Sequence, residues 1–301
     1  MNADAGGPAG FAATNAVVGT TPEPRIVGSF PETWVNGSEC GNEPAIQVWE
    51  YAQDTYILRQ SQCTNFEGPF MYLLFGGDQA LLLDTGAGSI QIGGAVSGLI
   101  ARYAQATGQS PIQLTVAHTH AHGDHIAGDG QFLGRPFTDV VTPNVGSVIS
   151  FFGFTDWPND SVTFSLGERV LDVLGIPGHE DSHIALYDRN TALLLTGDTL
   201  YPGFLFIGNA VSQGNFVKYQ ASIQRLVDFT ADRPVNWVLG THVEMTSTPS
   251  VAYRYGTTNQ PKERMLQLDR GHLLELNDAV IAMGADPVQE VHDDFIIQPI
   301  N

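Results

Sequence analysis

Three histidines and an aspartate lie within six consecutive positions of this chain, in the sequence HAHGDH at residues 120–125. An apolar run at 112–117 precedes them. If that run is a strand, its end delivers the first two histidines to one side, because side chains alternate along a strand. The aspartate and the last histidine follow after the chain has turned, so they need not face the same ion. The stretch therefore predicts a loop that two metal ions share.

A histidine-rich tract can also be a purification tag or a low-complexity segment. Such tracts lie at chain ends and have no apolar strand leading into them. The tract at 120–125 lies in the middle of the chain and directly follows an apolar run. Its position favours a metal site.

The composition argues against several classes of partner. The 301 residues are 43% hydrophobic and 15% charged, which is typical of a globular chain with a large core. The formal net charge is −19, so no basic stripe is expected to follow a phosphate backbone, and nucleic acid is not an expected partner. An acidic surface disfavours anionic membranes, and no run of about 18 apolar residues predicts a transmembrane helix.

The two cysteines, Cys40 and Cys63, are either free thiols or one disulfide. They flank a segment that is expected to form short strands, so a disulfide is geometrically plausible. A disulfide would indicate an oxidising compartment, the periplasm or the cell exterior, whereas free thiols would fit the cytoplasm.

The pattern of apolar residues predicts one domain at 29–301 after a flexible N-terminal extension at 1–28. The extension has no cationic segment followed by an apolar core, so an intact signal peptide is not expected. The remainder of a trimmed signal peptide and a disordered extension both fit this segment. The order is mostly strands followed by a helix, twice over, and one domain of two packed sheets with helices outside fits this order. Strands are expected at 45–49, 55–60, 70–75, 80–83, 112–117, 140–142, 161–164, 170–176, 184–187, 192–195, 235–238 and 295–300, and helices at 89–107, 145–152, 215–229 and 261–283.

Three later strand ends also carry a metal donor close to a glycine. They are PGH with His179, TGD with Asp198 and GTH with His242. One such end is weak evidence, because a lone histidine or aspartate after a strand is usually a cap or turn residue. Together with the first loop they predict one site. Imidazole and carboxylate donors without cysteine suit zinc, manganese or iron and favour a catalytic site over a structural one.

Asp84 ends the predicted strand at 80–83, just before a glycine turn. Two roles fit this position. Asp84 either caps the following helix or accepts a hydrogen bond from a metal-ligand histidine.

With these residues the sequence resembles the metallo-β-lactamase superfamily of hydrolases. The shared pattern is His-x-His-x-Asp-His, a later histidine, a bridging aspartate and a last histidine, and it is matched in order over about residues 45–245. The resemblance implies an α+β fold, the αββα sandwich of two mixed sheets with helices outside. It also implies two divalent ions, with zinc the expected metal, and a place for Asp84 behind the site.

The resemblance also implies how the donors divide. One ion is expected on His120, His122 and His179. The other is expected on Asp124, His125 and His242. Asp198 would bridge the two.

The expected mechanism follows from the metals. Two ions that share a water would lower its pKa and generate a hydroxide that attacks a carbonyl. Asp124 would orient this nucleophile and carry its proton. The predicted function is that of a dinuclear metal-dependent hydrolase of a carboxyl ester or lactone. A promiscuous β-lactamase activity could accompany it. The alternatives are a β-lactamase or thioesterase of the same fold, or a mononuclear iron persulfide dioxygenase.

An aspartate at the bridging position favours lactonases and glyoxalase-like thioesterases over the dedicated β-lactamases, by the same resemblance. In the lactonases a tyrosine three positions after the bridging aspartate hydrogen-bonds the substrate carbonyl, and Tyr201 has that position here. A phenol can stabilise an oxyanion. The alternative is a tyrosine that only packs in the interior.

His183 follows His179 by four residues. It is a candidate proton donor to the leaving group or a hydrogen-bond partner of a ligand. A plain core or surface histidine is the alternative.

Two apolar segments, at 201–210 and 151–157, are candidate walls of the substrate site. They predict a small-molecule substrate with an apolar portion. Few cations lie near the motifs, which weakens the prediction of an anionic thiol carrier.

Overall fold

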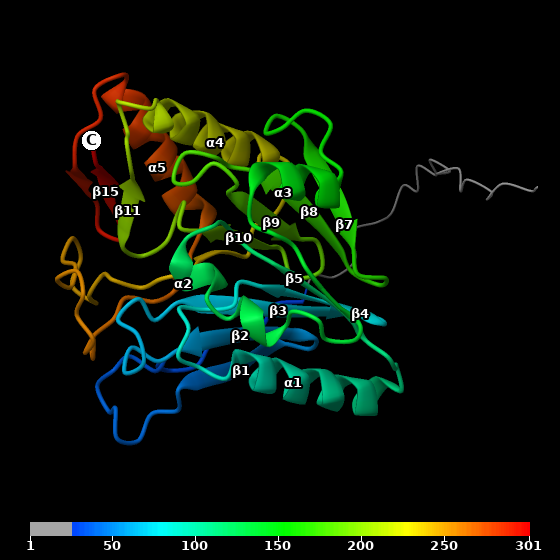
Figure 1. The fold of residues 1–301 in the computed structure, drawn as a ribbon. Coiled ribbons are helices and arrows are strands. Elements are labelled where there is room, and N and C mark those ends of the chain that lie inside the picture. The colour runs from blue at the N-terminus through cyan, green and yellow to red at the C-terminus, as the bar shows by residue number, and fades with distance from the viewer. Residues whose placement is uncertain (1–25) are drawn as a thin grey trace, which may run out of the picture.

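The computed structural model describes residues 26–301, and Figure 1 shows their arrangement in layers of helices and sheets. The predicted extension at 1–28 lies outside the described residues except for its last three. At that boundary the Ile26 N–H donates to the Asn190 carbonyl at 3.1 Å.

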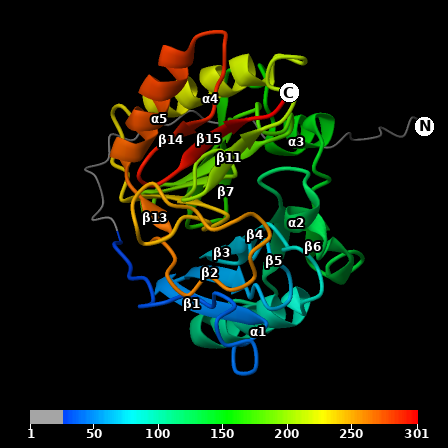
Figure 2. The ribbon, with the colours of Figure 1, turned by 90° about the vertical axis from the view of Figure 1, so that its left-hand side faces the viewer.

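Two six-stranded sheets form the centre of the fold, and a three-stranded sheet lies at the C-terminal side (Figures 1 and 2). The first sheet contains β1 (Ile46–Ala52), β2 (Thr55–Gln60), β3 (Phe70–Gly76), β4 (Gln79–Leu83), β5 (Gln113–Ala117) and β6 (Thr138–Val140), in that order. The second contains, in spatial order, β13 (Gln267–Leu268), β12 (Trp237–Gly240), β10 (Leu193–Gly197), β9 (Ile184–Asp188), β8 (Val170–Gly175) and β7 (Ser161–Ser165). The third contains β11 (Phe204–Ile207), β15 (Ile296–Pro299) and β14 (Glu290–Val291).

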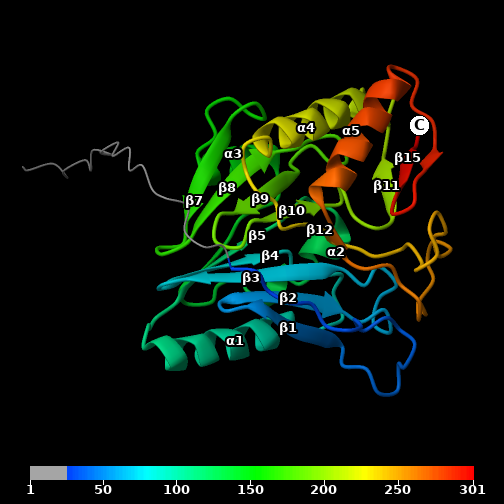
Figure 3. The same ribbon diagram turned by 180° about the vertical axis from the view of Figure 1, so that it is seen from behind.

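Helices cover the outer faces of the two large sheets. α1 (Ile92–Thr107) lies against the first sheet, and α4 (Asn215–Phe229) and α5 (Arg270–Met283) lie against the second (Figure 3). α3 (Val145–Phe152) packs near β7, and the short α2 (Gly123–Ile126) follows β5. The order helix, sheet, sheet, helix is the predicted αββα sandwich, and this prediction is confirmed.

Alternation along the strands divides the core into layers. In β3 and β4, Leu73 and Leu82 are fully buried under α1, whereas Leu74 and Leu81 are buried between the two sheets. Strands that are buried on both faces need apolar residues at nearly every position. The near-continuous apolar runs of the sequence therefore become the two central sheets.

Several elements differ from the sequence predictions: α2, β13 and β14 were not predicted, and β6 lies at 138–140 where a strand was predicted at 140–142. The helix predicted at 261–283 begins only at Arg270, because the Asp269 side chain caps its first turn by accepting from the His272 N–H. The strand predicted at 295–300 spans Ile296–Pro299 and joins β11 in the third sheet, although no strand was predicted at 204–207.

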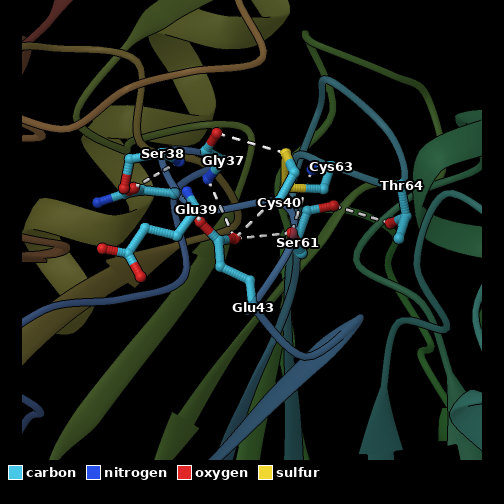
Figure 4. Close-up of a disulfide and its surroundings, with 9 residues drawn as sticks. Gly37, Ser38, Glu39, Cys40, Glu43, Ser61, Cys63 and Thr64 are labelled. Atoms are coloured by element: carbon cyan, nitrogen blue, oxygen red, sulfur yellow. Dashed lines mark hydrogen bonds between the residues drawn. A yellow bond between two sulfur atoms is a disulfide. The ribbon is translucent and has the colours of Figure 1, made fainter.

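Cys40 and Cys63 form a disulfide, which resolves the alternative left open by the sequence (Figure 4). The carboxylate of Glu43 lies beside it and accepts hydrogen bonds from the Gly37 N–H and the Ser61 hydroxyl. The bond and this carboxylate together hold the loop before β1 against the end of β2. Among residues 26–301, no helix is both long and apolar enough to cross a bilayer.

The chain directions bring several strand ends to one edge. β4 and β5 are parallel neighbours in the first sheet, and β8, β10 and β12 run in a common direction in the second. Residues that follow these five strands can therefore meet between the sheets.

Candidate metal centre

Two groups of donors converge at this edge, and they share one aspartate. One group is His120, His122, His179 and Asp198, and the other is Asp124, His125, Asp198 and His242. Within each group the donor atoms lie within 4.8 Å of one another. All seven predicted ligands thus come together, in the predicted division.

In the first group three imidazole nitrogens face one another. The His122 Nδ1 lies 2.9 Å from the Nε2 of His120 and 2.9 Å from the Nε2 of His179. The Asp198 Oδ2 lies 3.7 Å from the His120 Nε2 and 3.5 Å from the His179 Nε2. Lone pairs at these separations repel unless a proton or a cation lies between them.

In the second group two carboxylates face two imidazoles. The Asp124 Oδ2 lies 3.2 Å from the Nε2 of His125 and 3.2 Å from the Nε2 of His242. Asp198 uses Oδ2 toward His125 at 3.5 Å and Oδ1 toward His242 at 3.4 Å. Because both of its oxygens are directed into the site, Asp198 is placed to serve two ions.

The outer nitrogens of four histidines are hydrogen-bonded, which orients the inner nitrogens. Two Nδ1–H groups donate to backbone carbonyls, that of His179 to Phe206 at 2.7 Å and that of His242 to Glu67 at 2.9 Å. A carbonyl only accepts, so these rings carry their proton on Nδ1 and present a free lone pair at Nε2.

Asp84 and Thr119 orient the other two rings. The His125 Nδ1 contacts the Asp84 Oδ2 at 2.9 Å, and the His120 Nδ1 contacts the Thr119 hydroxyl at 3.1 Å. That hydroxyl donates in turn to Asp84 at 2.8 Å. Of the two roles open from the sequence, the geometry supports the second, a carboxylate behind a ligand histidine.

The donor set fits divalent cations. Two nitrogens on one tetrahedral zinc, each at about 2.0–2.1 Å, are about 3.3 Å apart. The nitrogens of the first group are slightly closer than this, and the buried His125 Nε2 faces the carboxylates of Asp124 and Asp198 at 3.2 Å and 3.5 Å. A metal ion in each group would satisfy these atoms.

The pKa shifts of these residues are also consistent with a cation site. Burial, together with the neighbouring His125, holds the pKa of His120 well below its usual value. Burial also opposes charge on His125, but Asp198, Asp84 and Asp124 outweigh it and raise the pKa of that ring. The histidines around Asp198 lower the pKa of its carboxyl against the effect of burial. The carboxylate that the two groups share is therefore ionised.

One glycine allows the strand ends to approach closely. Gly197 has φ +54°, and a Cβ there would lie 2.4 Å from the His183 Nε2 and 2.8 Å from the Thr119 Cβ. Any side chain at 197 would push Asp198 away from the histidine loop.

Tyr201 lies beside the donor groups, but its hydroxyl is directed to the backbone of Phe204. Its ring is 5.4 Å from that of His242, and the hydroxyl donates to the Phe204 carbonyl. The side chain is buried, with the Glu244 carboxylate nearby. To act as a donor to a substrate oxygen, the hydroxyl would have to leave the Phe204 carbonyl. The geometry favours the packing alternative.

His183 is fully buried behind His120, and the two ring centroids are 4.7 Å apart in a stacked arrangement. Its Nδ1 contacts the Thr199 hydroxyl at 3.4 Å, and its Nε2 has no partner. With no exposure, it has no path to a leaving group. The geometry favours a core histidine that supports a ligand ring by stacking.

Of the two segments predicted as substrate walls, one lines a pocket and the other is largely part of the core. In the segment 201–210, Phe204 and Phe206 line an open pocket together with Tyr255. In the segment 151–157, Phe152 and Phe154 are buried in the core between the sheets.

Sequence reasoning did not identify Thr119, Glu67, Glu244 or Tyr255. Thr119 and Glu67 act through a hydroxyl and a backbone carbonyl, which carry no metal-ligand signature. Glu244 is buried, and burial raises its pKa to about 7. Its Oε2 accepts the Phe204 N–H at 2.8 Å. The nearness of Glu244 to the motif residue His242 was the only available signal.

Comparisons with known proteins agree with this geometry. Residues 64–242 match the family described as the metallo-beta-lactamase superfamily. This segment includes all seven donors.

Curated relatives match over shorter segments. A hydroxyacylglutathione hydrolase of Methylococcus capsulatus is 34% identical over 98 residues, which are 32% of this chain and 38% of that protein. An acyl-coenzyme A thioesterase of Gallus gallus is 36% identical over 81 residues, 27% of this chain and 28% of that protein. The chain thus matches less than half of the length of either relative.

Solved structures share the fold. A metallo-beta-lactamase from Pontibacter korlensis has a TM-score of 0.51 and 16% identity, covering 78% of this chain and 99% of its own. A metallo-beta-lactamase from Pseudomonas aeruginosa in its mono-zinc form has a TM-score of 0.50 and 15% identity, covering 81% and 98%. At these identities the likeness concerns the fold alone.

Proposed function

We propose that this chain, which belongs to the metallo-beta-lactamase superfamily, is a hydrolase that uses two divalent metal ions to cleave a carboxyl ester or lactone. One observation carries the proposal: two groups of donors share Asp198, and each group is complete without cysteine. Histidine with few carboxylates suits zinc.

The metal ions, when bound, would polarise a substrate carbonyl and lower the pKa of a water. The chain's own groups would organise this chemistry. The hydrogen bonds to Asp84, Thr119, Glu67 and Phe206 hold the ligand rings in place before substrate arrives. Such preorganisation avoids reorientation during the reaction.

Asp124 is the candidate for handling the proton. Its side chain retains 20% exposure, whereas the neighbouring His125 has none. The histidines around it lower the pKa of its carboxyl, against the effect of burial. An ionised carboxylate at the open side of the site can orient a water and accept its proton.

A thioester is the second candidate substrate. It is supported by the two relatives named as a hydroxyacylglutathione hydrolase and an acyl-coenzyme A thioesterase. Both names refer to thioesters of an anionic thiol carrier. The five residues that line the pocket at Phe204, Phe206 and Tyr255, in contrast, carry no charge. That lining favours an uncharged substrate over an anionic one.

The test is a hydrolysis panel of lactones, aryl esters, thioesters and β-lactams, run on protein of measured metal content. We expect two zinc ions per chain and the highest kcat/KM on a lactone or aryl ester. One iron per chain with oxygen consumption on a persulfide would replace the proposal with the dioxygenase alternative.

Replacement of the shared aspartate tests the two-ion arrangement. We expect Asp198→Ala to lose hydrolysis and at least one metal ion, because both groups lose a donor. Asp139→Ala, at an exposed position of β6, is the matched control and keeps both. Unchanged turnover in Asp198→Ala would remove the bridging role. Metal content is measured by atomic emission and hydrolysis by product formation.

The disulfide supports a further part of the proposal, a location in an oxidising compartment such as the periplasm or the cell exterior. The proposed partner is a small-molecule substrate with an apolar portion.

A further inference from the structure

We propose that the pocket on the outer face of the third sheet binds an uncharged aromatic ring of the substrate. This inference rests on the proposed function, because the pocket is placed beside the metal centre of that function. It adds a substrate class that the metal donors alone do not define.

The pocket is built by alternation along two paired strands. Phe204 and Phe206 lie on one face of β11, and Gln298 of β15 and Ile300 just after it lie on the same face of the sheet, with Phe206 paired to Gln298. Tyr255 closes one side, and the volume is about 530 Å³. This size is within the range of small-molecule sites.

The outward face of this sheet is apolar although folding does not require it to be. Leu205 and Ile207, the alternate residues of β11, are fully buried in the core and anchor the sheet. Phe204 and Phe206 face the other way and remain partly exposed. A contiguous apolar surface of this kind usually marks a binding site.

The ring geometry suits a flat ligand. The rings of Phe204 and Phe206 are 5.7 Å apart and inclined by 25°, whereas the ring of Tyr255 meets Phe206 edge-on at 5.8 Å and 81°. These rings form a floor and a perpendicular wall. An aromatic ring placed between them can stack on the floor and meet the wall edge to face, the two arrangements that aromatic pairs prefer.

Each side of the pocket is joined to a different donor group. The Phe206 carbonyl accepts from the Nδ1–H of His179, a donor of the first group. On the other side the Tyr255 hydroxyl contacts the Glu67 Oε1 at 3.2 Å, and the Glu67 carbonyl accepts from His242 of the second group. An aromatic ring of the substrate in this pocket would therefore lie next to the candidate metal centre, where the substrate's own carbonyl group would be held.

The charges around the pocket exclude an anionic ring. None of the lining residues is basic, Gln298 supplies the polar contact, and the Glu67 carboxylate lies beyond Tyr255. A carboxylate on the ring would meet no counter-charge there.

The experiment measures binding without turnover. The metal-loaded protein is titrated with 2-naphthamide, octanamide and 2-naphthoate by calorimetry, for the wild type, Phe206→Ala and Tyr255→Ala. Tyr255 lies on an exposed loop, so its replacement does not disturb the backbone bond of His179. Val217→Ala, at an exposed apolar position of α4, is the matched control.

We expect 2-naphthamide to bind more tightly than either other probe. Phe206→Ala and Tyr255→Ala should each raise the Kd of 2-naphthamide about tenfold. An aromatic pair contributes about 0.5–1.5 kcal/mol beyond its buried area, and a factor of ten is about 1.4 kcal/mol. Val217→Ala should leave the Kd unchanged. Equal Kd values in all four proteins, or tighter binding of octanamide or 2-naphthoate, would overturn the inference.

Hydrolysis of the small ester methyl acetate separates this inference from the proposed function. A wild-type protein that hydrolyses methyl acetate but binds the three probes equally well would overturn the pocket and leave the proposed function standing. Naphthamide binding that depends on Phe206 and Tyr255, in a protein that hydrolyses no ester, lactone or thioester, would support the pocket and remove the proposed function.

Discussion

At the scale of single residues, Asp84 links the backbone to the metal centre. Its φ is +68°, in the left-handed region that aspartate and asparagine tolerate better than most residues. In this conformation one carboxylate accepts from the Thr119 N–H at 2.7 Å, the Thr119 hydroxyl at 2.8 Å and the His125 Nδ1–H at 2.9 Å. The unusual backbone is therefore explained by the three bonds it permits.

Asp84→Asn tests this role. Asparagine keeps the left-handed backbone, but its NH₂ faces groups that already donate. We expect metal affinity to fall by about 10- to 100-fold, the usual effect of losing a partner of a ligand histidine. Competition with a chromophoric chelator measures the affinity. Asp129→Asn is the control, because Asp129 binds Thr85 and His118, which are outside both donor groups. Equal losses in the two variants would contradict a specific role for Asp84.

The structure changes the result that we expect for the variant Tyr201→Phe. As an oxyanion donor, Tyr201 would supply a factor of about 10²–10³ in kcat. Because its buried hydroxyl donates to the Phe204 carbonyl, we expect kcat on a lactone to fall less than tenfold and the free energy of unfolding to fall by about 1–3 kcal/mol. Steady-state kinetics and urea unfolding measure both. A loss near 10³ in kcat with unchanged stability would restore the catalytic role.

At the scale of elements, most strands of the two large sheets were predictable because they are short apolar or alternating runs between turn residues. The seven donor residues were predictable because they follow the ends of such runs. β13 was not, since its two residues lie in a segment whose pattern predicted a helix. The start of α5 was not, since an Asp269 cap has the same sequence signature as any exposed aspartate. Nor was β11: its strand character depends on β15, which lies about 90 residues later and supplies the paired edge.

The same limit applies to the pocket and to the groups behind the ligands. Tyr255 and Glu67 are far apart in sequence and meet only after folding. Glu67 acts on His242 through its carbonyl, which every residue has. No side-chain pattern can predict such a contact.

The disulfide provides an element-scale prediction. Cys40 and Cys63 are 23 residues apart, and closing a loop of this length stabilises a fold by about 3 kcal/mol in the chain-entropy account. We expect the double variant Cys40→Ser, Cys63→Ser to lose about that much free energy of unfolding. A reducing agent should lower the stability of the wild type by a similar amount and leave the variant unaffected. Equal stability of wild type and variant would show that the Glu43 contacts alone hold the loop.

At the scale of the whole molecule, the four layers place the strand ends, and hence both donor groups, at one edge of the sandwich (Figure 1). The outer surface has a second effect. A net charge of −19 gives the protein a negative field that acts on every approaching substrate before any contact forms. If the pocket binds the substrate as we propose, specificity would depend both on the pocket and on the sign of the substrate's charge.

This field predicts how salt changes thioester hydrolysis. Between about 0.01 M and about 1 M salt the screening length falls from about 30 Å to about 3 Å. We expect kcat/KM for an acyl-coenzyme A to rise by about tenfold or more over this range as repulsion is screened, whereas kcat/KM for the neutral S-phenyl thioacetate stays nearly constant. The neutral substrate controls for direct effects of salt on the metal centre. A fall in kcat/KM for the anionic substrate would mean that a local basic site outweighs the net charge, and it would favour an anionic thiol carrier over the uncharged aromatic substrate.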